Sequence, residues 1–223
     1  MSVLNYSLPK AGGFIDNLAL KKRLQMLQIF LEEFPKNSFA NVLDVGVTAD
    51  TDALASNYFE QYFTAREKIT ALSNQDAKFL EELYPGLTFK KGDARQLPFD
   101  DNSMDVVFSS AVIEHIGSLQ QQKQMLRECL RVARKGVFIT TPNRWHPMEA
   151  HTLIPLLHWL PKSMHRRILR ILGLNFYARE ENLNLVDKKT LSLICNELRI
   201  KQFSIKSLST FKIVSNLMLI IKK

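Results

Sequence analysis

The sequence has little cysteine and no long apolar run, and both shortages limit what the protein can be. Its 223 residues include only two cysteines, Cys129 and Cys195, which are too few for a disulfide framework or a zinc site and are predicted to be buried thiols. No apolar run approaches the roughly 20 residues that a membrane-spanning helix needs. Residues 1–10 lack the basic and then apolar pattern of a signal peptide. We therefore expect a cytoplasmic protein.

Acidic residues are also scarce relative to basic ones. The 30 lysines and arginines exceed the 22 aspartates and glutamates, and the net charge is +8. This surplus indicates an anionic partner, which leaves nucleic acid, a phospholipid surface and an acidic or phosphorylated substrate open. No zinc-finger spacing, RRM signature or basic-aromatic repeat accompanies the charge, so the sequence predicts no nucleic-acid partner.

Alternating strand and helix patterns run through most of the chain and predict an α/β fold with a doubly wound sheet. Helices are expected at 14–34, 75–84, 119–133 and 187–198, and a polar loop with an irregular helix at 48–63. Strands are expected at 41–46, 68–72, 87–90, 104–109, 137–140, 200–208 and 212–221. Asp16 and Asp187 are expected to cap the first and last of these helices. The result is a seven-stranded, mostly parallel sheet with helices on both faces.

Residues 142–186 interrupt this alternation and are too long for an ordinary loop. The segment carries helical patterning of its own, at 153–160 before Pro161 and again at 168–172. We therefore predict a helical insertion or lid after the fifth strand. The sheet domain would then comprise residues 1–141 and 187–223.

A ligand site is expected where the stretch 41–46 ends. Its branched apolar residues are typical of a strand that is covered on both faces, and Gly46 allows a sharp turn and the close approach of a ligand. Asp44 is costly to bury without a partner, so we expect it to point toward loop amides or a bound polar group. In doubly wound sheets, ligands bind beyond the carboxyl ends of the strands.

Four motifs follow one another in a characteristic order. They are Val42-Leu43-Asp44-Val45-Gly46, then Gly92-Asp93-Ala94-Arg95 with Leu97-Pro98-Phe99, then Met104-Asp105-Val106-Val107 with Glu114-His115, and last Arg131-Val132-Ala133-Arg134-Lys135-Gly136. Together they resemble the class I S-adenosylmethionine-dependent methyltransferases of type 11, over about residues 40–141. The resemblance implies a Rossmann-like fold, S-adenosylmethionine as cofactor and S-adenosylhomocysteine as its product.

The resemblance also implies roles for single residues. Gly46 would pass under the methionine portion of the cofactor, and Asp44 would help to hold its amino end. Asp93 with Ala94 would bind the adenine. Ser109 and Ser110 would end the fourth strand beside the sulfonium, where the methyl group leaves, with Ser109 taken as the residue that contacts the cofactor.

Two departures from the family pattern concern cofactor binding. Only the first glycine of the usual Gly-x-Gly-x-Gly loop is present, and Thr48 or Asp50 would supply polar contacts in its place. The acid that usually binds the ribose hydroxyls after the second strand is also missing, and Ser73 and Asn74 occupy the nearest positions. These losses leave open a degenerate binding protein that keeps the fold and uses its basic insertion on a membrane or partner.

Histidines supply the candidate catalytic residues. Four of the five histidines lie in the insertion, and His115, His146 and His151 are candidates for a base or an orienting group toward the methyl acceptor. A base is needed only if the acceptor group stays protonated at neutral pH. The alternative is that these histidines cap helices and bond the backbone. Their spacing matches no zinc pattern, so no metal site is predicted.

The insertion is the part most informative about the acceptor. Residues 153–174 mix leucine, isoleucine and tryptophan with four basic residues and no acid, which is typical of helices at a membrane surface. The alternative is a lid whose apolar face packs on the sheet domain. We therefore expect an S-adenosylmethionine-dependent methyltransferase with a small-molecule or lipid-linked acceptor, with peripheral contact to an anionic inner membrane face left open.

Overall fold

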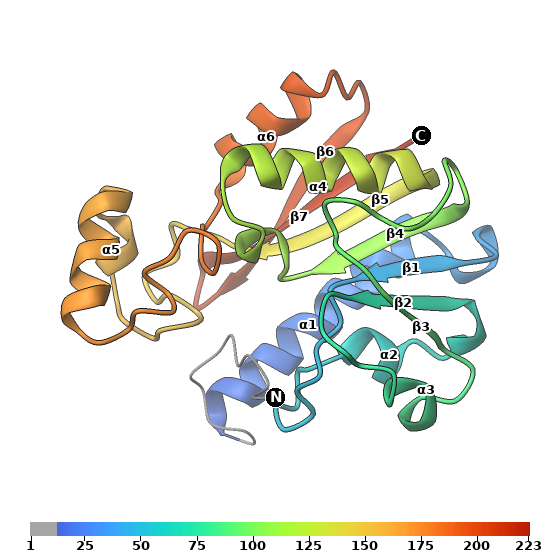
Figure 1. Cartoon of the computed structure of the whole chain (residues 1–223), viewed down its shortest axis with the longest axis horizontal. Coiled ribbons are helices and arrows are strands. Elements are labelled where there is room, and N and C mark those ends of the chain that lie inside the picture. Colours follow the sequence, from blue (N-terminus) through green and yellow to red (C-terminus); the bar gives the residue numbers. More distant parts are fainter. Residues whose placement is uncertain (1–12) are drawn as a thin grey trace.

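A seven-stranded sheet between two layers of helices forms the body of the protein, as the computed structural model in Figure 1 shows. The structure describes residues 13–223. Residues 1–12, which include the stretch predicted not to be a signal peptide, lie outside the described residues. Within the described part of the chain, no helix is long and apolar enough to cross a membrane.

The sheet has the strand order β3-β2-β1-β4-β5-β7-β6. Its strands are β1 (Val42–Val45), β2 (Ile69–Ser73), β3 (Thr88–Lys91), β4 (Met104–Ser110), β5 (Ala133–Pro142), β6 (Phe203–Thr210) and β7 (Ile213–Lys222). β1 to β5 are parallel, whereas β7 runs antiparallel to both β5 and β6. The prediction of a seven-stranded, mostly parallel sheet is confirmed.

Helices cover both faces of the sheet. One layer contains α1 (Phe14–Glu33), α2 (Tyr58–Tyr62) and α3 (Leu80–Leu83), and the other contains α4 (Leu119–Val132) and α6 (Lys188–Glu197). Helix α5 (Lys162–Ile171) lies away from the sheet in Figure 1. Short 3-10 turns occur at Lys36–Ser38, Arg66–Lys68, Ile113–His115 and Leu157–Trp159.

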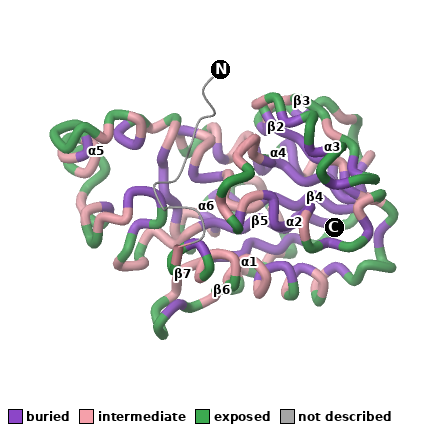
Figure 2. The backbone as a smooth tube through the Cα atoms, turned by 90° about the horizontal axis from the view of Figure 1, so that it is seen from below, coloured by how far each residue is buried: buried purple, intermediate pink, exposed green. Residues whose placement is uncertain are grey.

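Each helical layer forms its own apolar core with the sheet, because successive side chains of a strand point to opposite faces. Val42 and Phe138 pack toward α1, whereas Leu43 and Val137 pack toward α4. The central strands are buried on both faces (Figure 2). This explains why they read as continuous apolar runs in the sequence.

Three of the predicted helices differ from the structure. The irregular helix within 48–63 is reduced to α2, and the helix predicted at 75–84 is reduced to α3. The helix predicted at 153–160 is wrong: only a 3-10 turn forms at its end, and Leu153 and Leu156 have left-handed backbones with φ of 57° and 62°. Pro155 lies between these two leucines and has no amide hydrogen to donate to a helical ladder.

One predicted helix cap is present and the other is not. The Asp187 side chain accepts a hydrogen bond from the backbone amide of Thr190 at 2.7 Å, as expected at the start of α6. Asp16 does not cap α1, since Gly13 holds the capping position. Asp16 instead accepts a hydrogen bond from the amide of Leu54 at 2.9 Å, which ties α1 to the loop after β1.

The segment between β5 and α6 has a small apolar cluster of its own, built from Leu169, Tyr177, Ala178, Leu183 and Leu185. The cluster lies on one side of α5, whose opposite side is exposed. The assignment of residues 142–186 as a separate lid stays a prediction.

Phe30 at the centre of the α1 layer gives the first test. It is fully buried, and its ring centroid lies 5.2–6.0 Å from those of five other phenylalanines. We expect Phe30→Ala to lower the free energy of unfolding by about 3–5 kcal/mol, because it leaves a cavity among these rings. Urea denaturation measures the change. Phe211→Ala, at a side chain that is 77% exposed, should change it by less than about 0.5 kcal/mol, and equal effects would contradict this account of the core.

Candidate active site

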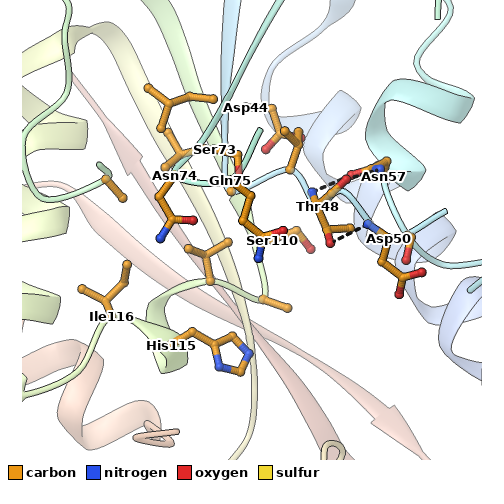
Figure 3. Close-up of a pocket in the computed structure, with 18 of the residues that line it drawn as sticks. Asp44, Thr48, Asp50, Asn57, Ser73, Asn74, Gln75, Ser110, His115 and Ile116 are labelled. Carbon is orange, nitrogen blue, oxygen red and sulfur yellow. Dashed lines mark hydrogen bonds between the residues drawn. The ribbon is translucent and has the colours of Figure 1, made fainter. Parts of the chain in front are cut away.

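A cavity of about 380 Å³ lies at the carboxyl ends of the parallel strands (Figure 3). Its volume is in the range of sites for small molecules and cofactors. Of the eight residues predicted to bind the cofactor, the seven that line it are Asp44, Gly46, Thr48, Ser73, Asn74, Asp93 and Ala94. Two candidate catalytic residues, His115 and His151, line the same cavity. The structure thus brings residues from three of the four motifs together with Ser73, Asn74 and His151.

Two predicted site residues lie elsewhere. Ser109 is fully buried and donates its hydroxyl hydrogen to the carbonyl oxygen of Val45 at 2.8 Å. Because side chains alternate along a strand, Ser110 lines the cavity in its place. His146 is not among the lining residues, and its Nδ1 lies 2.9 Å from the carbonyl oxygen of Met148.

Gly46 makes the turn that leads from β1 into the cavity. Its φ of +105° is a conformation that residues with a side chain rarely adopt. A Cβ atom at this position would lie 2.1 Å from Cγ2 of Val112. Glycine is therefore required by the backbone and by the neighbouring segment after β4.

Side-chain hydrogen bonds hold the loop after Gly46 where the family pattern has further glycines. The amide of Thr48 donates to Oδ1 of Asn57, and Nδ2 of Asn57 donates to the carbonyl of Thr48, both at 2.9 Å. The Thr48 hydroxyl accepts from the amide of Asp50 at 3.1 Å, as drawn in Figure 3. Asn57 has φ of 48°, which asparagine tolerates better than most residues. The loop is therefore ordered by polar side chains.

A pair of buried acids lies beneath this loop. Asp44 is 6% exposed and Glu60 of α2 is fully buried. Burial raises the pKa of Asp44 to about 7, against the opposing effects of the neighbouring Glu60 carboxyl and the charge of Arg23. Burial and the nearby Asp44 charge hold the pKa of Glu60 well above its usual range. At neutral pH the pair therefore carries fewer than two negative charges.

Among the lining residues that escaped the sequence analysis are Arg23 of α1, and Tyr58 and Glu60 of α2. The Arg23 guanidinium donates to the carbonyl of Ala55 and lies 5.4 Å from the centroid of the Tyr58 ring. The Tyr58 hydroxyl donates to Oγ of Ser110 at 3.2 Å. The aromatic-rich run 58–63 was visible in the sequence, but nothing in it indicated which side chains face the cavity.

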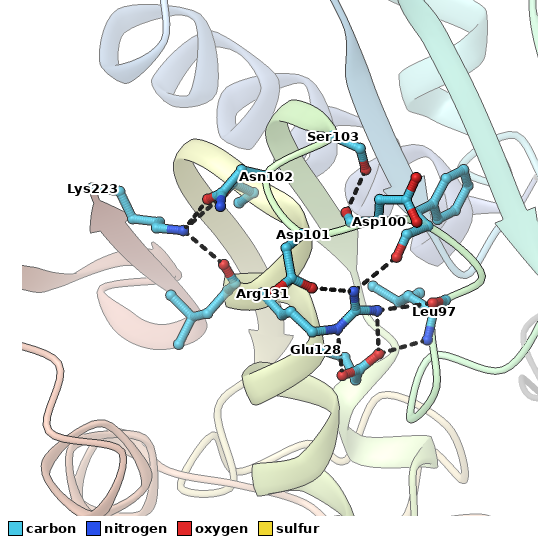
Figure 4. Close-up of polar contacts among 11 residues, drawn as sticks. Leu97, Asp100, Asp101, Asn102, Ser103, Glu128, Arg131 and Lys223 are labelled. Atoms are coloured by element: carbon cyan, nitrogen blue, oxygen red, sulfur yellow. Dashed lines mark hydrogen bonds and ion pairs between the residues drawn. The ribbon is translucent and has the colours of Figure 1, made fainter.

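The adenine end of the predicted site is held by an ion pair and by hydrogen bonds from an arginine. The Asp93 carboxylate lies 2.6 Å from the Arg95 guanidinium, whose hydrogen bonds lower the pKa of Asp93. Just beyond, Arg131 of α4 donates to the carbonyls of Leu97 and Phe99 at 2.9 and 2.8 Å (Figure 4). This network fixes the segment between β3 and β4 against α4.

The two cavity-lining histidines are each oriented by a hydrogen bond at Nδ1. Nδ1 of His151 lies 2.6 Å from Oε1 of Glu149, and Nδ1 of His115 lies 2.6 Å from the carbonyl oxygen of Asn182. Burial alone would raise the pKa of Glu149, but the hydrogen bonds and charge of His151, with Thr152, hold it at about 2. Burial lowers the pKa of His115 to about 3, so its ring is neutral at neutral pH.

The acid pair predicts how stability depends on pH. Since its pKa values are raised on folding, the folded protein binds more protons than the unfolded chain, and stability should fall as the pH rises from about 4 through about 7. Glu60→Gln removes the second acid and should make this fall shallower. Urea denaturation at about pH 5 and about pH 8 measures it. Glu67→Gln, at an exposed position, is the control, and identical pH dependence in the two variants would exclude the acid pair as its source.

The comparison with known proteins covers the part of the chain that builds this cavity. A family model described as a methyltransferase domain matches residues 43–140. A probable S-adenosylmethionine-dependent methyltransferase of Mycolicibacterium smegmatis is 46% identical over 63 residues, which are 27% of this chain and 23% of that protein. The phthiotriol/phenolphthiotriol dimycocerosates methyltransferase of Mycobacterium tuberculosis is 33% identical over 112 residues, or 47% of this chain and 38% of that one. The chain therefore spans less than half the length of these curated relatives.

Solved structures share the whole fold. A Thermotoga maritima protein described as a possible histamine N-methyltransferase has a TM-score of 0.59 at 14% identity, covering 94% of this chain and 91% of its own. An S-adenosylmethionine-dependent methyltransferase of Methanosarcina mazei has a TM-score of 0.56 at 18% identity, covering 87% and 96%. Residues 43–140 therefore match a methyltransferase domain, and the chain as a whole has the fold of these S-adenosylmethionine-dependent methyltransferases.

Proposed function

We propose that the protein transfers a methyl group from S-adenosylmethionine to a small-molecule or lipid-linked acceptor. The observation that carries this proposal is the single cavity shared by seven predicted cofactor residues and two histidines. The curated relatives quoted above are named as methyltransferases, and none supports the alternative of a degenerate binding protein.

The residues of the cavity fit the cofactor. Gly46 lines the cavity where the methionine portion would lie, and Asp44 would accept a hydrogen bond from its amino group. Ser73 and Asn74 offer uncharged partners to the ribose hydroxyls, and Asp93 offers a carboxylate oxygen to the adenine amine. The bound cofactor would supply a methyl group already activated by the sulfonium, so that the protein's part is to position and orient.

His115 and His151 define the side of the cavity from which an acceptor would approach. Neither belongs to the predicted cofactor contacts, and both rings are held by outer hydrogen bonds. Preorganised polar groups of this kind suit the alignment of an acceptor atom with the methyl group.

Cofactor binding is the first test, and Asp44 is the residue to change. We expect calorimetry to show binding of both S-adenosylmethionine and S-adenosylhomocysteine, with at least about tenfold weaker binding by Asp44→Asn because the amino group loses its charged acceptor. Binding by the natural protein should also weaken below about pH 7, where Asp44 takes up a proton, and the variant should lose this dependence.

Asp52→Asn is the matched control, since Asp52 is exposed in the same loop and does not line the cavity. It should bind both ligands as the natural protein does. If neither ligand releases heat with the natural protein at high concentration, the proposed function is wrong.

Part of our proposal is that helix α5 brings the protein to the inner face of an anionic membrane, where a lipid-linked acceptor would be available. Met164, Ile171 and Leu172 are 50%, 75% and 54% exposed, and Arg167 and Arg170 lie on the surface of the same helix. Exposed apolar side chains beside basic ones suit the boundary between headgroups and acyl chains. The M. tuberculosis relative, by its name, methylates phthiotriol and phenolphthiotriol dimycocerosates.

Sedimentation with vesicles tests this placement. The protein should sediment with vesicles that contain anionic phospholipid at low salt, and Arg167→Glu with Arg170→Glu should abolish this because two attractive charges become repulsive. Lys188→Glu with Lys189→Glu makes the same charge change at exposed positions on α6 and should sediment normally. Equal loss in the two double variants would show that net charge, not α5, is responsible.

A further inference from the structure

Glu114, His115 and His151 bring one carboxylate and two imidazoles together beside the cavity. One potential ligand atom from each lies within 4.8 Å of the other two. Glu114 and His115 belong to the 3-10 turn after β4, and His151 follows β5. The two rings are nearly perpendicular, with centroids 4.7 Å apart.

Every member of this cluster has an outer partner that fixes its orientation. His151 is held at Nδ1 by the Glu149 carboxylate, and His115 at Nδ1 by the carbonyl of Asn182. Since a carbonyl only accepts, Nδ1 of His115 carries the hydrogen and Nε2 carries the lone pair. A carboxylate or carbonyl on the far nitrogen is the usual arrangement around histidines that bind metals.

Glu114 is the member that points most directly to a cation. Its side chain is fully buried, and Oε2 accepts a hydrogen bond from the Thr141 hydroxyl at 2.9 Å. Oε1 is buried without a hydrogen-bond partner among the described residues. A buried carboxylate oxygen with no partner is costly, and a bound cation would offset that cost.

We propose that Oε1 of Glu114 and Nε2 of His115 and His151 form a site for a divalent transition-metal ion. Two imidazoles and one carboxylate are the protein ligands of several catalytic zinc and iron sites, which keep further coordination positions open. Imidazole ligands favour zinc, iron, cobalt or nickel over magnesium and calcium.

The position of the site indicates what its open positions would bind. His115 and His151 line the cavity that also contains Asp44 and Gly46. An acceptor that offers an oxygen ligand, such as a hydroxyl or carboxylate group, would reach the metal from this cavity. This assignment of the acceptor class rests on the proposed function, whereas the metal site itself does not.

Cobalt is a suitable probe because its visible absorption reports ligand type and geometry. The full chain, freed of metals by dialysis against a chelator, should bind about one Co²⁺ per chain with the absorption of a site that contains nitrogen ligands. Glu114→Gln and His151→Ala should abolish this band. Glu149→Gln should weaken binding by about 10–100-fold, because it removes only the outer partner of His151. His165→Ala, on α5 and outside the cluster, should bind Co²⁺ normally.

S-Adenosylhomocysteine binding, measured on the same variants, separates the possible outcomes. Variants that lose Co²⁺ but still bind S-adenosylhomocysteine are folded, and the metal site is then supported. A natural protein that binds S-adenosylhomocysteine but not Co²⁺ overturns the metal site and leaves the proposed function standing. A natural protein that binds Co²⁺ but not S-adenosylhomocysteine supports the metal site and overturns the proposed function. An unchanged cobalt band in Glu114→Gln and His151→Ala would place the ion elsewhere and overturn the proposal.

Discussion

The carbonyl oxygen of Leu72 accepts hydrogen bonds from the amides of both Gly46 and Val47, at 2.7 and 3.2 Å, and the arrangement of the site depends on this contact. It fixes the point at which β1 stops and the chain turns across the end of β2. The absence of a side chain at Gly46 then allows Val112, after β4, to close on the same turn. The ends of β1, β2 and β4 are thereby held together, and residues at and after these ends line the cavity.

Polar side chains order the loop after this turn, at the positions where the usual family pattern has further glycines. Asn57 bonds both the amide and the carbonyl of Thr48, so the loop has a preferred shape before any ligand binds. A preordered loop lowers the conformational entropy lost on binding. The departure from the glycine pattern is therefore compatible with a binding site, although it replaces backbone freedom with a specific side-chain contact.

The sequence was most informative where one local pattern determines the outcome. The apolar strand 42–45, the glycine after it and the cap at Asp187 each act through neighbours in the chain, and each was predicted correctly. Because parallel strands end at one edge, the residues that follow them could also be assigned to a common site, as seven cavity residues were.

Prediction failed where distant contacts or side-chain direction decide the result. Glu60 and Arg23 line the cavity, but the spacing of apolar residues in their helices did not show which side faces the sheet edge. Glu60 lies near Asp44 only because the chain folds α2 against β1. The sequence did not show which of Ser109 and Ser110 faces the cavity, because both are small and polar and the direction of a side chain at a strand end depends on the register. The cluster of Glu114 with two histidines likewise joins separate segments, and no motif spacing indicates it.

The antiparallel strand β7 has a consequence for how the sheet can be assembled. β6 precedes β7 in the chain, yet in the sheet it is separated from β5 by β7. β6 therefore cannot join the parallel strands directly and must pair with β7 as a hairpin. The parallel half, with the cavity-forming turns, has no such requirement, because each of its strands can pair as soon as its neighbour is present. Because the pairing of β6 with β7 is local in the chain, the two strands can form a hairpin before they join the sheet, and β7 then docks onto β5.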